Sequence, residues 1–211
     1  MARGRLISFE GIDGCGKSTQ IRLAADYWQR EGWDVKILQE PGGTPVGERI
    51  RQLLLSHSEQ PGAVEMEPLA EFLLFAAARA QLVRQVIIPL LDSGKTVLLD
   101  RFTDSSLAYQ GYGRGLDLGF IREVNRVAAA GLTPDLTILF DMEPAASLAR
   151  LSGETDRMER LGLTFFQRVR NGFLELAAAE PQRWRVIDGT GERDQVFREV
   201  VKLLGLRFPG Q

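Results

Sequence analysis

Five short runs of apolar and β-branched residues recur along the chain, separated by stretches of different periodicity. Runs of this length and composition are typical of strands buried on both faces of a parallel sheet. The five runs are Leu6–Glu10, Val35–Gln39, Thr96–Asp100, Leu136–Asp141 and Trp184–Asp188.

The stretches between the runs are amphipathic or Ala-rich, which indicates helices. In residues 17–31, four apolar side chains share one face at helical spacing: Ile21, Ala24, Ala25 and Trp28. Gly32 can end that helix. Alternating strands and helices predict an α/β fold, with a parallel five-stranded sheet and helices on both faces. No repeat, low-complexity tract or Pro/Gly-rich linker divides the 211 residues, so we expect one domain over residues 1–211.

Charged and Gly-rich residues follow the first four predicted strands. They are residues 10–13, residues 40–43, Arg101 and residues 141–143. In an open α/β sheet, ligands bind in the crevice outside the carboxyl ends of the strands. The sequence therefore predicts a binding site at this edge of the sheet.

A phosphate-binding loop follows the first strand. Residues 11–18 fit the pattern Gly, four residues, Gly-Lys and Ser/Thr, between a predicted strand and a predicted helix. Glycines let backbone N–H groups surround phosphate oxygens, Lys17 can reach the β- and γ-phosphates, and Ser18 can ligate Mg²⁺. The residues predicted to bind the phosphates of ATP are Gly11, Asp13, Gly14, Cys15, Gly16, Lys17, Ser18 and Thr19.

Composition and charge exclude several classes of function. An apolar fraction of 44% and a charged fraction of 26% are those of a globular protein, and a net charge of −2 does not favour a nucleic-acid partner. The apolar stretch at the N-terminus is too short for a signal peptide, and no run approaches a membrane span, so we expect a cytoplasmic protein. One cysteine and one histidine, His57, exclude an internal disulfide and a Cys-based zinc cluster.

Five segments resemble those of bacterial thymidylate kinases, which are P-loop nucleoside monophosphate kinases. The resemblance extends over nearly the whole chain, and its third and fourth segments are more specific than the phosphate loop. The segments are residues 9–19, residues 40–44 with Arg51, residues 74–79, residues 100–115, and residues 156–157. The resemblance implies the fold of these kinases with a short lid, transfer of a phosphoryl group from ATP to dTMP, Mg²⁺ as cofactor, and a homodimer. A GTPase is not favoured, because no guanine-reading Asn/Thr-Lys-x-Asp segment is present.

The resemblance also assigns residues to the acceptor nucleotide. Phe75 and Arg79 are four residues apart on a predicted helix, so the ring can stack on a pyrimidine while the guanidinium donates to its carbonyl edge. Arg51 and Arg101 correspond to clamps on the acceptor phosphate, a task that suits the guanidinium fork. The other implied residues are Asp13 at the sugar 3′-hydroxyl, Ser105, and Tyr109 and Gln110 beside the base and the sugar 2′ position.

Residues of about 143–161 correspond to the lid that closes over ATP. Relatives with a plain glycine in the phosphate loop, as Gly14 is here, carry several lid arginines, but this lid looks shorter and has Ser152 where an arginine is common. Arg150 and Arg157 are seven residues apart and would face the same phosphates if the stretch is helical, with Arg160 as a third candidate. The predicted catalytic residues are Lys17, Arg101, Arg150 and Arg157.

The expected mechanism needs no histidine and no activated serine. The attacking oxygen of a phosphate monoester is already anionic, so positioning and charge neutralisation do most of the work. Ser18 and Asp100 are the predicted Mg²⁺ ligands, the second directly or through water. Two alternatives remain open at this point: a kinase for another nucleoside monophosphate, and a non-catalytic nucleotide-binding module.

Overall fold

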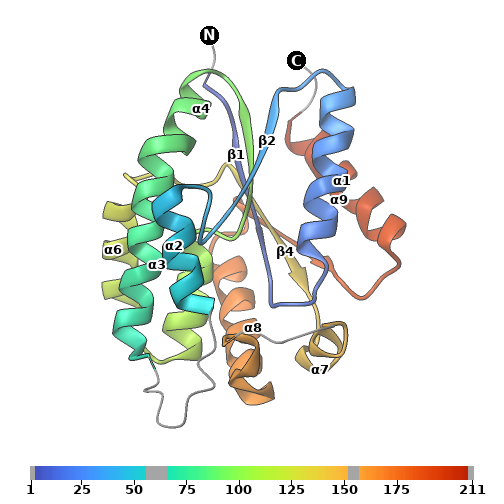
Figure 1. The fold of residues 1–211 in the computed structure, drawn as a ribbon. Coiled ribbons are helices and arrows are strands. Elements are labelled where there is room, and N and C mark those ends of the chain that lie inside the picture. The colour runs from blue at the N-terminus through green and yellow to red at the C-terminus, as the bar shows by residue number, and fades with distance from the viewer. Residues whose placement is uncertain (1–2, 56–65, 152–156, 209–211) are drawn as a thin grey trace.

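The computed structural model describes residues 3–55, 66–151 and 157–208. Five parallel strands form one sheet in the order β2-β3-β1-β4-β5, with β1 at the centre (Figure 1). The strands are β1 (Leu6–Glu10), β2 (Val35–Gln39), β3 (Thr96–Asp100), β4 (Leu136–Asp141) and β5 (Trp184–Asp188). All five have the predicted bounds, and the α/β fold class is confirmed.

The helices alternate with the strands along the chain. They are α1 (Lys17–Arg30), α2 (Pro45–Leu55), α3 (Pro68–Leu82), the π-helix η1 (Val83–Ile87), α4 (Ile88–Asp92), α5 (Thr103–Ser106), the π-helix η2 (Leu107–Gly113), α6 (Leu118–Ala128), α7 (Pro144–Leu148), the 3₁₀-helix η3 (Glu159–Leu161), α8 (Leu163–Ala179) and α9 (Arg193–Arg207). The predicted apolar face of α1 is buried, and Gly32, with a φ of 87°, follows its end as expected.

The three central strands of the sheet are more buried than the two edge strands. The first five residues of β1 and β4, and the first four of β3, are buried, which matches their continuous apolar runs. The edge strands β2 and β5 each leave one large apolar side chain about half exposed, Ile37 and Val186.

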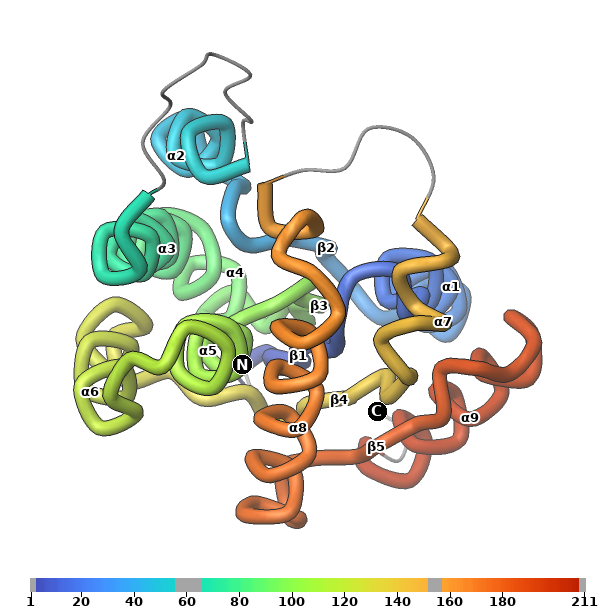
Figure 2. Tube along the Cα trace, turned by 90° about the horizontal axis from the view of Figure 1, so that it is seen from below, coloured from blue at the N-terminus to red at the C-terminus, as the bar shows by residue number. Residues whose placement is uncertain are grey.

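Helices cover both faces of the sheet. Helices α1 and α9 lie on one face, while α3, α4, α5, η2 and α8 lie on the other (Figures 1 and 2). Within the core, Phe9 of β1 stacks on Phe140 of β4, with 6.0 Å between the ring centroids. Figure 2 looks onto the carboxyl ends of the strands, the edge at which the sequence places the site.

One expectation about membranes needs correction. The continuous helical run Pro68–Asp92 is long and apolar enough to span a membrane by length and composition, although we expected no such segment. Charged residues such as Glu71 and Arg79 interrupt the apolar sequence of this run, so it does not read as a membrane span; the fold buries both of them. Leu82, Val83 and Ile87 of the same run are buried in the core against Leu99 and its neighbours, so the run is an element of the domain.

Candidate active site

The phosphate loop connects β1 to α1 at the carboxyl edge of the sheet, as predicted (Figure 1). Gly11, Gly14 and Gly16 have φ values of 137°, 83° and 95°, which only glycine adopts readily. A Cβ atom on Gly14 would lie 2.2 Å from the carbonyl oxygen of Ser147 on α7. Close packing on α7 therefore requires a glycine here and leaves no room for a cationic side chain.

Lys17 and Cys15 lie on the inner side of the loop. Both side chains are buried, and the Lys17 Nζ donates to the carbonyl oxygens of Gly11 at 2.9 Å and Ile12 at 3.0 Å. The Cys15 Sγ is 3.7 Å from the same Nζ. The ammonium group is therefore held at the loop, while the thiol fills the space beneath it.

Ser18 and Asp100 meet across the ends of α1 and β3. The Ser18 Oγ donates to the Asp100 Oδ2 at 2.8 Å. Hydroxyl and carboxylate oxygens suit Mg²⁺, which is usually held by one or two carboxylates together with substrate phosphates and water. Within residues 3–55, 66–151 and 157–208, no group of three or more His, Cys, Asp or Glu side chains could hold a metal ion. The two oxygen donors fit a Mg²⁺ ion shared with a nucleotide, and a cage made only of protein ligands is not formed by the described residues.

A pocket next to the phosphate loop collects every residue predicted for the acceptor. Its lining includes Asp13, Arg51, Phe75, Arg79, Arg101, Ser105, Tyr109 and Gln110. A second cleft runs along the phosphate loop past Lys17, Ser18 and Asp100. The pocket and the cleft share four residues: Asp13, Glu40, Arg51 and Arg101. Two anionic ligands, one in each, would therefore meet between these four side chains.

Arg101 forms the centre of this junction. Its Nη2 donates to the Asp13 Oδ1 at 2.5 Å and to the Tyr109 hydroxyl at 3.1 Å, and that hydroxyl donates to the Asp13 Oδ2 at 2.8 Å. Its Nη1 donates to the Gly11 carbonyl oxygen at 3.0 Å and to the Ser105 Oγ at 3.2 Å. Burial by itself would raise the pKa of Asp13, but the charges of Arg101 and Lys17 outweigh it and lower that pKa to about 2. The junction is therefore a charged, interlocked group at neutral pH.

Arg79 forms the floor of the acceptor pocket. It is buried, and its Nε donates to the Glu40 Oε2 at 2.8 Å, while Nη1 donates to the Asn125 Oδ1 at 2.5 Å. Its Nη2 donates to the Phe102 carbonyl oxygen and the Ser106 Oγ, at 3.2 and 3.1 Å. Burial raises the pKa of Glu40 to about 7 despite the pull of Arg79. These partners fix the guanidinium plane beside Phe75, which lines the same pocket.

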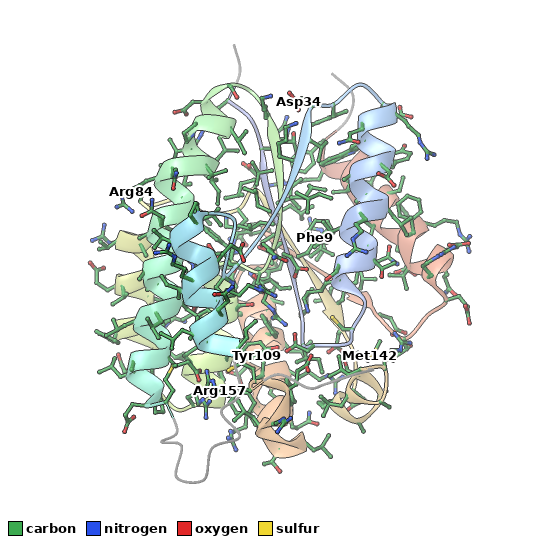
Figure 3. All side chains as sticks on the ribbon, viewed as in Figure 1. Phe9, Asp34, Arg84, Tyr109, Met142 and Arg157 are labelled. Atoms are coloured by element: carbon green, nitrogen blue, oxygen red, sulfur yellow. The ribbon has the colours of Figure 1, made fainter. Side chains whose placement is uncertain are left out.

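The candidate lid arginines lie on different parts of the molecule. Arg150 donates from Nη1 and Nη2 to the carbonyl oxygens of Gly189 and Thr190, at 3.1 and 3.2 Å. Arg157 donates from Nε to the Leu54 carbonyl oxygen at 2.8 Å, and Figure 3 shows it at the same lower edge as Tyr109. The stretch is not one helix in its described part, because α7 ends at Leu148 and the next element is η3. Arg150 and Arg157 therefore do not lie on one helix, which was the condition for both side chains to face the same phosphates. Ser152 and Asp156, like His57, fall outside the described residues.

Three buried carboxyl groups at the site, Glu10, Glu40 and Glu71, have no role assigned from the sequence, although Glu10 and Glu40 lie in charged segments at the predicted edge. Glu71 of α3 accepts from the Gln110 Nε2 at 2.9 Å and pairs with the Nη2 atoms of Arg114 and Arg157, each at 2.8 Å. Glu10, at the end of β1, lies beside the turn that carries Arg101. The signal for Glu10 was present, since a charged residue ends an otherwise buried strand, but its partners are more than ninety residues away in sequence.

Comparisons with known proteins agree on one family. The model of the family described as thymidylate kinase matches residues 9–200. The chain is 49% identical to a thymidylate kinase of Deinococcus radiodurans over 95% of its own length and 96% of that relative. It is 51% identical to a thymidylate kinase of Pelotomaculum thermopropionicum, over 95% and 92% of the two chains. The crystal structure of thymidylate kinase from Ehrlichia chaffeensis superposes with a TM-score of 0.77 at 34% identity, covering 96% of this chain and 98% of that one.

Proposed function

This chain belongs to the thymidylate kinase family, and we propose that it transfers the γ-phosphoryl group of ATP to dTMP, which yields ADP and dTDP. One observation of the structure carries this proposal most directly. The phosphate-loop cleft and the acceptor pocket share Asp13, Glu40, Arg51 and Arg101 in their linings, so a donor and an acceptor phosphate could meet there. A binding module would have no need of two adjoining sites that share a pair of arginines.

The reaction requires charge neutralisation more than proton transfer. An oxygen of the acceptor phosphate attacks the γ-phosphorus, the bond from that phosphorus to the β–γ bridging oxygen breaks, and ADP leaves. Lys17 would neutralise the β- and γ-phosphates, and Arg101 and Arg51 would hold the acceptor phosphate in line with the γ-phosphorus. Asp13, whose pKa is about 2, stays ionised and holds Arg101 by a charged hydrogen bond. By resemblance to the family, Asp13 would also bind the 3′-hydroxyl of the sugar.

Mg²⁺ fits the donor set of Ser18 and Asp100. When bound with ATP, the ion supplies positive charge to the phosphate oxygens. Ser18 would ligate it from the first turn of α1, and Asp100 would orient it directly or through water. The glycines and Thr19 of the loop would complete the contacts to the phosphates of ATP.

The acceptor pocket would recognise thymine through one aromatic face and one guanidinium. Phe75 would stack on the base, and Arg79, fixed by Glu40, Asn125 and Ser106, would donate to a carbonyl oxygen of the base. Tyr109 and Gln110 would crowd the sugar 2′ position. Gln110 donates to the buried Glu71, which would hold it in that position and favour a deoxyribose over a ribose.

The catalytic roles of Arg150 and Arg157 belong to this proposal. Negative charge spreads over the equatorial oxygens of the phosphoryl group in flight, and a cation that approaches on lid closure stabilises that state. The packing of Gly14 on Ser147 leaves no room for a cationic side chain at position 14, which supports a source of charge in addition to Lys17. We keep Arg150 and Arg157 as the first candidates and Arg160 as the third.

We also propose a homodimer, which the family resemblance implies, and we infer α3 and α6 as its interface from their exposed apolar side chains. These helices lie side by side (Figure 1), and both expose large apolar side chains. The exposed side chains are Leu69 and Leu73 on α3 and Phe120 and Val127 on α6. A cytoplasmic location stays our expectation, since ATP and nucleoside monophosphates are cytoplasmic substrates.

A coupled assay of ADP release over a panel of nucleoside monophosphates tests the proposed function. With ATP and Mg²⁺ present, dTMP should be the best acceptor, and dCMP and the ribonucleotide analogue of dTMP should be much poorer. If UMP, CMP or AMP ranked above dTMP, the substrate would be wrong and the kinase class would stand. If no acceptor stimulated ADP release, the chain would be a nucleotide-binding module.

A further inference from the structure

Glu10 is a fully buried carboxyl group whose two oxygens both bond to one turn. It is the last residue of β1, and its side chain is not exposed at all. The Oε1 accepts from the backbone N–H of Phe102 at 2.8 Å, and the Oε2 accepts from the Ser105 Oγ at 2.6 Å. Phe102 follows Arg101 in the link between β3 and α5, and Ser105 lies in α5, so the turn that Glu10 holds comprises residues 101–105.

This turn has a conformation that needs support. Arg101 has a φ of 70°, in the left-handed region, which costs about 1–2 kcal/mol for a residue other than glycine. Its backbone N–H donates to the Phe9 carbonyl oxygen at 3.1 Å, so the strained residue is tied to β1 on one side. On the other side, Glu10 binds the next backbone N–H in the chain. The two bonds together hold the peptide units on either side of Arg101.

Glu10 also reaches the guanidinium group of Arg101 through one intermediate. The Ser105 hydroxyl that donates to Glu10 accepts from the Arg101 Nη1 at 3.2 Å. One carboxyl group thus orders both the backbone of Arg101 and one nitrogen of its side chain. That side chain sits where the acceptor pocket meets the phosphate-loop cleft.

We propose that Glu10 is a positioning residue for phosphoryl transfer, which acts by holding residues 101–105 so that Arg101 reaches the acceptor phosphate. Glu10 lines neither the pocket nor the cleft, so it acts through Arg101 and touches no nucleotide. This inference rests on the proposed function.

Charge gives a reason for the burial of this particular group. Burial and the nearby Asp104 raise the pKa of Glu10 to about 8, although Ser105 and Arg101 pull it down. Near pH 7 the carboxyl group is therefore mostly neutral. It holds the turn through hydrogen bonds without competing as an anion with a phosphate for the charge of Arg101.

A double-mutant cycle between Glu10 and Arg101 tests the proposal, because a purely structural residue would not depend on Arg101. We expect Glu10→Ala to lower kcat/KM for dTMP at least about 30-fold, with the KM for ATP changed less than about threefold. In the Arg101→Ala background, the same Glu10→Ala change should alter kcat/KM less than about threefold, because the group it positions is gone. Glu10→Gln should recover most of the loss, since an amide can accept from Phe102 and donate to the Ser105 oxygen.

Ser8→Ala is the matched control. Ser8 lies two residues earlier on the same face of β1, is fully buried, and bonds the Thr137 hydroxyl at 2.8 Å away from the turn. Its loss removes a buried hydrogen bond from the same strand and should leave kcat/KM for dTMP within about twofold of wild type.

Multiplicative losses in the two backgrounds, or equal increases in KM for both nucleotides, would overturn the proposal. If Glu10→Ala does not fold, Ser105→Ala in the wild-type and Arg101→Ala backgrounds tests the same link, and its loss should likewise vanish without Arg101. The wild-type assay separates the two inferences. Absence of dTMP-dependent ADP release would refute the proposed function, whereas an active wild type with multiplicative losses would refute only the role of Glu10.

Discussion

The Nη2 of Arg157 lies 2.8 Å from the Oε2 of Glu71, a carboxylate that is fully buried in α3. This pair ties Arg157 to the wall of the acceptor pocket, because Glu71 also accepts a hydrogen bond from Gln110, which lines that pocket. Arg157 therefore has two possible effects, one on the reaction and one on stability. The two can be separated by substitution.

For Arg157→Ala we expect a decrease in kcat of at least about tenfold, or roughly 1.4 kcal/mol, with a smaller change in the KM for dTMP. We also expect a loss of about 1–2 kcal/mol in the free energy of unfolding, because a buried carboxylate loses one charged partner but keeps Arg114. Steady-state kinetics and urea titration measure the two effects. Glu71→Gln is the control, since it weakens the pair and leaves Arg157 in place. If Glu71→Gln lowers kcat as much as Arg157→Ala, the effect comes from the pair and not from charge delivered to the phosphates.

For Arg150→Ala we also expect at least about a tenfold decrease in kcat. Arg150 is exposed and donates to the carbonyl oxygens of Gly189 and Thr190, so its loss should affect stability little. Arg160→Ala should have a smaller effect on kcat, which makes it the comparison variant. A double variant of Arg150→Ala and Arg157→Ala with nearly wild-type kcat would refute the lid assignment and direct attention to Arg101 and Lys17.

The base pocket gives a third prediction. Phe75 is partly exposed and lines the pocket beside Arg79, so Phe75→Ala should weaken dTMP binding by roughly 1–3 kcal/mol, the scale for losing an aromatic stacking surface. Titration calorimetry with dTMP and, separately, with an ATP analogue measures the difference. ATP binding should be nearly unchanged. Equal losses for both nucleotides would indicate that Phe75 serves the core.

Glu10 makes the stability of the protein depend on pH. Its pKa is about 8 in the folded chain and about 4.3 for an unperturbed glutamate, so between these values the folded state keeps a proton that the unfolded state releases. The stability that Glu10 contributes should therefore be fully present below about pH 4 and fall as pH rises to about 8, by up to about 1.4 kcal/mol per pH unit. The charged groups near Glu10 are Arg101, on the turn after β3, and Asp104 of α5, which itself pairs with Arg183.

Urea titrations of wild type and Glu10→Gln at pH 5, 6, 7 and 8 measure this contribution. Glu40, with a pKa of about 7, adds a dependence of the same sign to both proteins, so it cancels in the comparison. The wild type should lose more stability than the variant across the series. Parallel curves would show that Glu10 ionises freely in the folded state.

The proposed dimer gives the fifth prediction. Sedimentation at micromolar concentration should give a dimer, and Val127→Glu should give a monomer, because it places a charge on the exposed apolar face of α3 and α6. Val127 is 55% exposed, so the substitution should not disturb the fold. A wild-type monomer would refute the dimer.

The sequence by itself determined the five strands and the phosphate loop, because their signals are local. A continuous apolar run such as Leu136–Asp141, set between helical stretches, is typical of a strand buried on both faces of a parallel sheet, and the glycines at positive φ are required by the loop that they form. The resemblance to thymidylate kinases placed eight acceptor residues, and the fold brings all eight into one pocket.

Only the tertiary structure decided which charged groups meet. Of 26 lysines and arginines, sequence spacing alone could not assign Arg157 to Glu71 or Arg150 to the carbonyl groups near Gly189. A long, flexible side chain finds its partner through the packing of distant elements, and the partners of Glu10 lie 92 and 95 residues away. Burial then sets the protonation of each carboxyl group, so Glu10 and Asp13, three residues apart, have pKa values of about 8 and about 2.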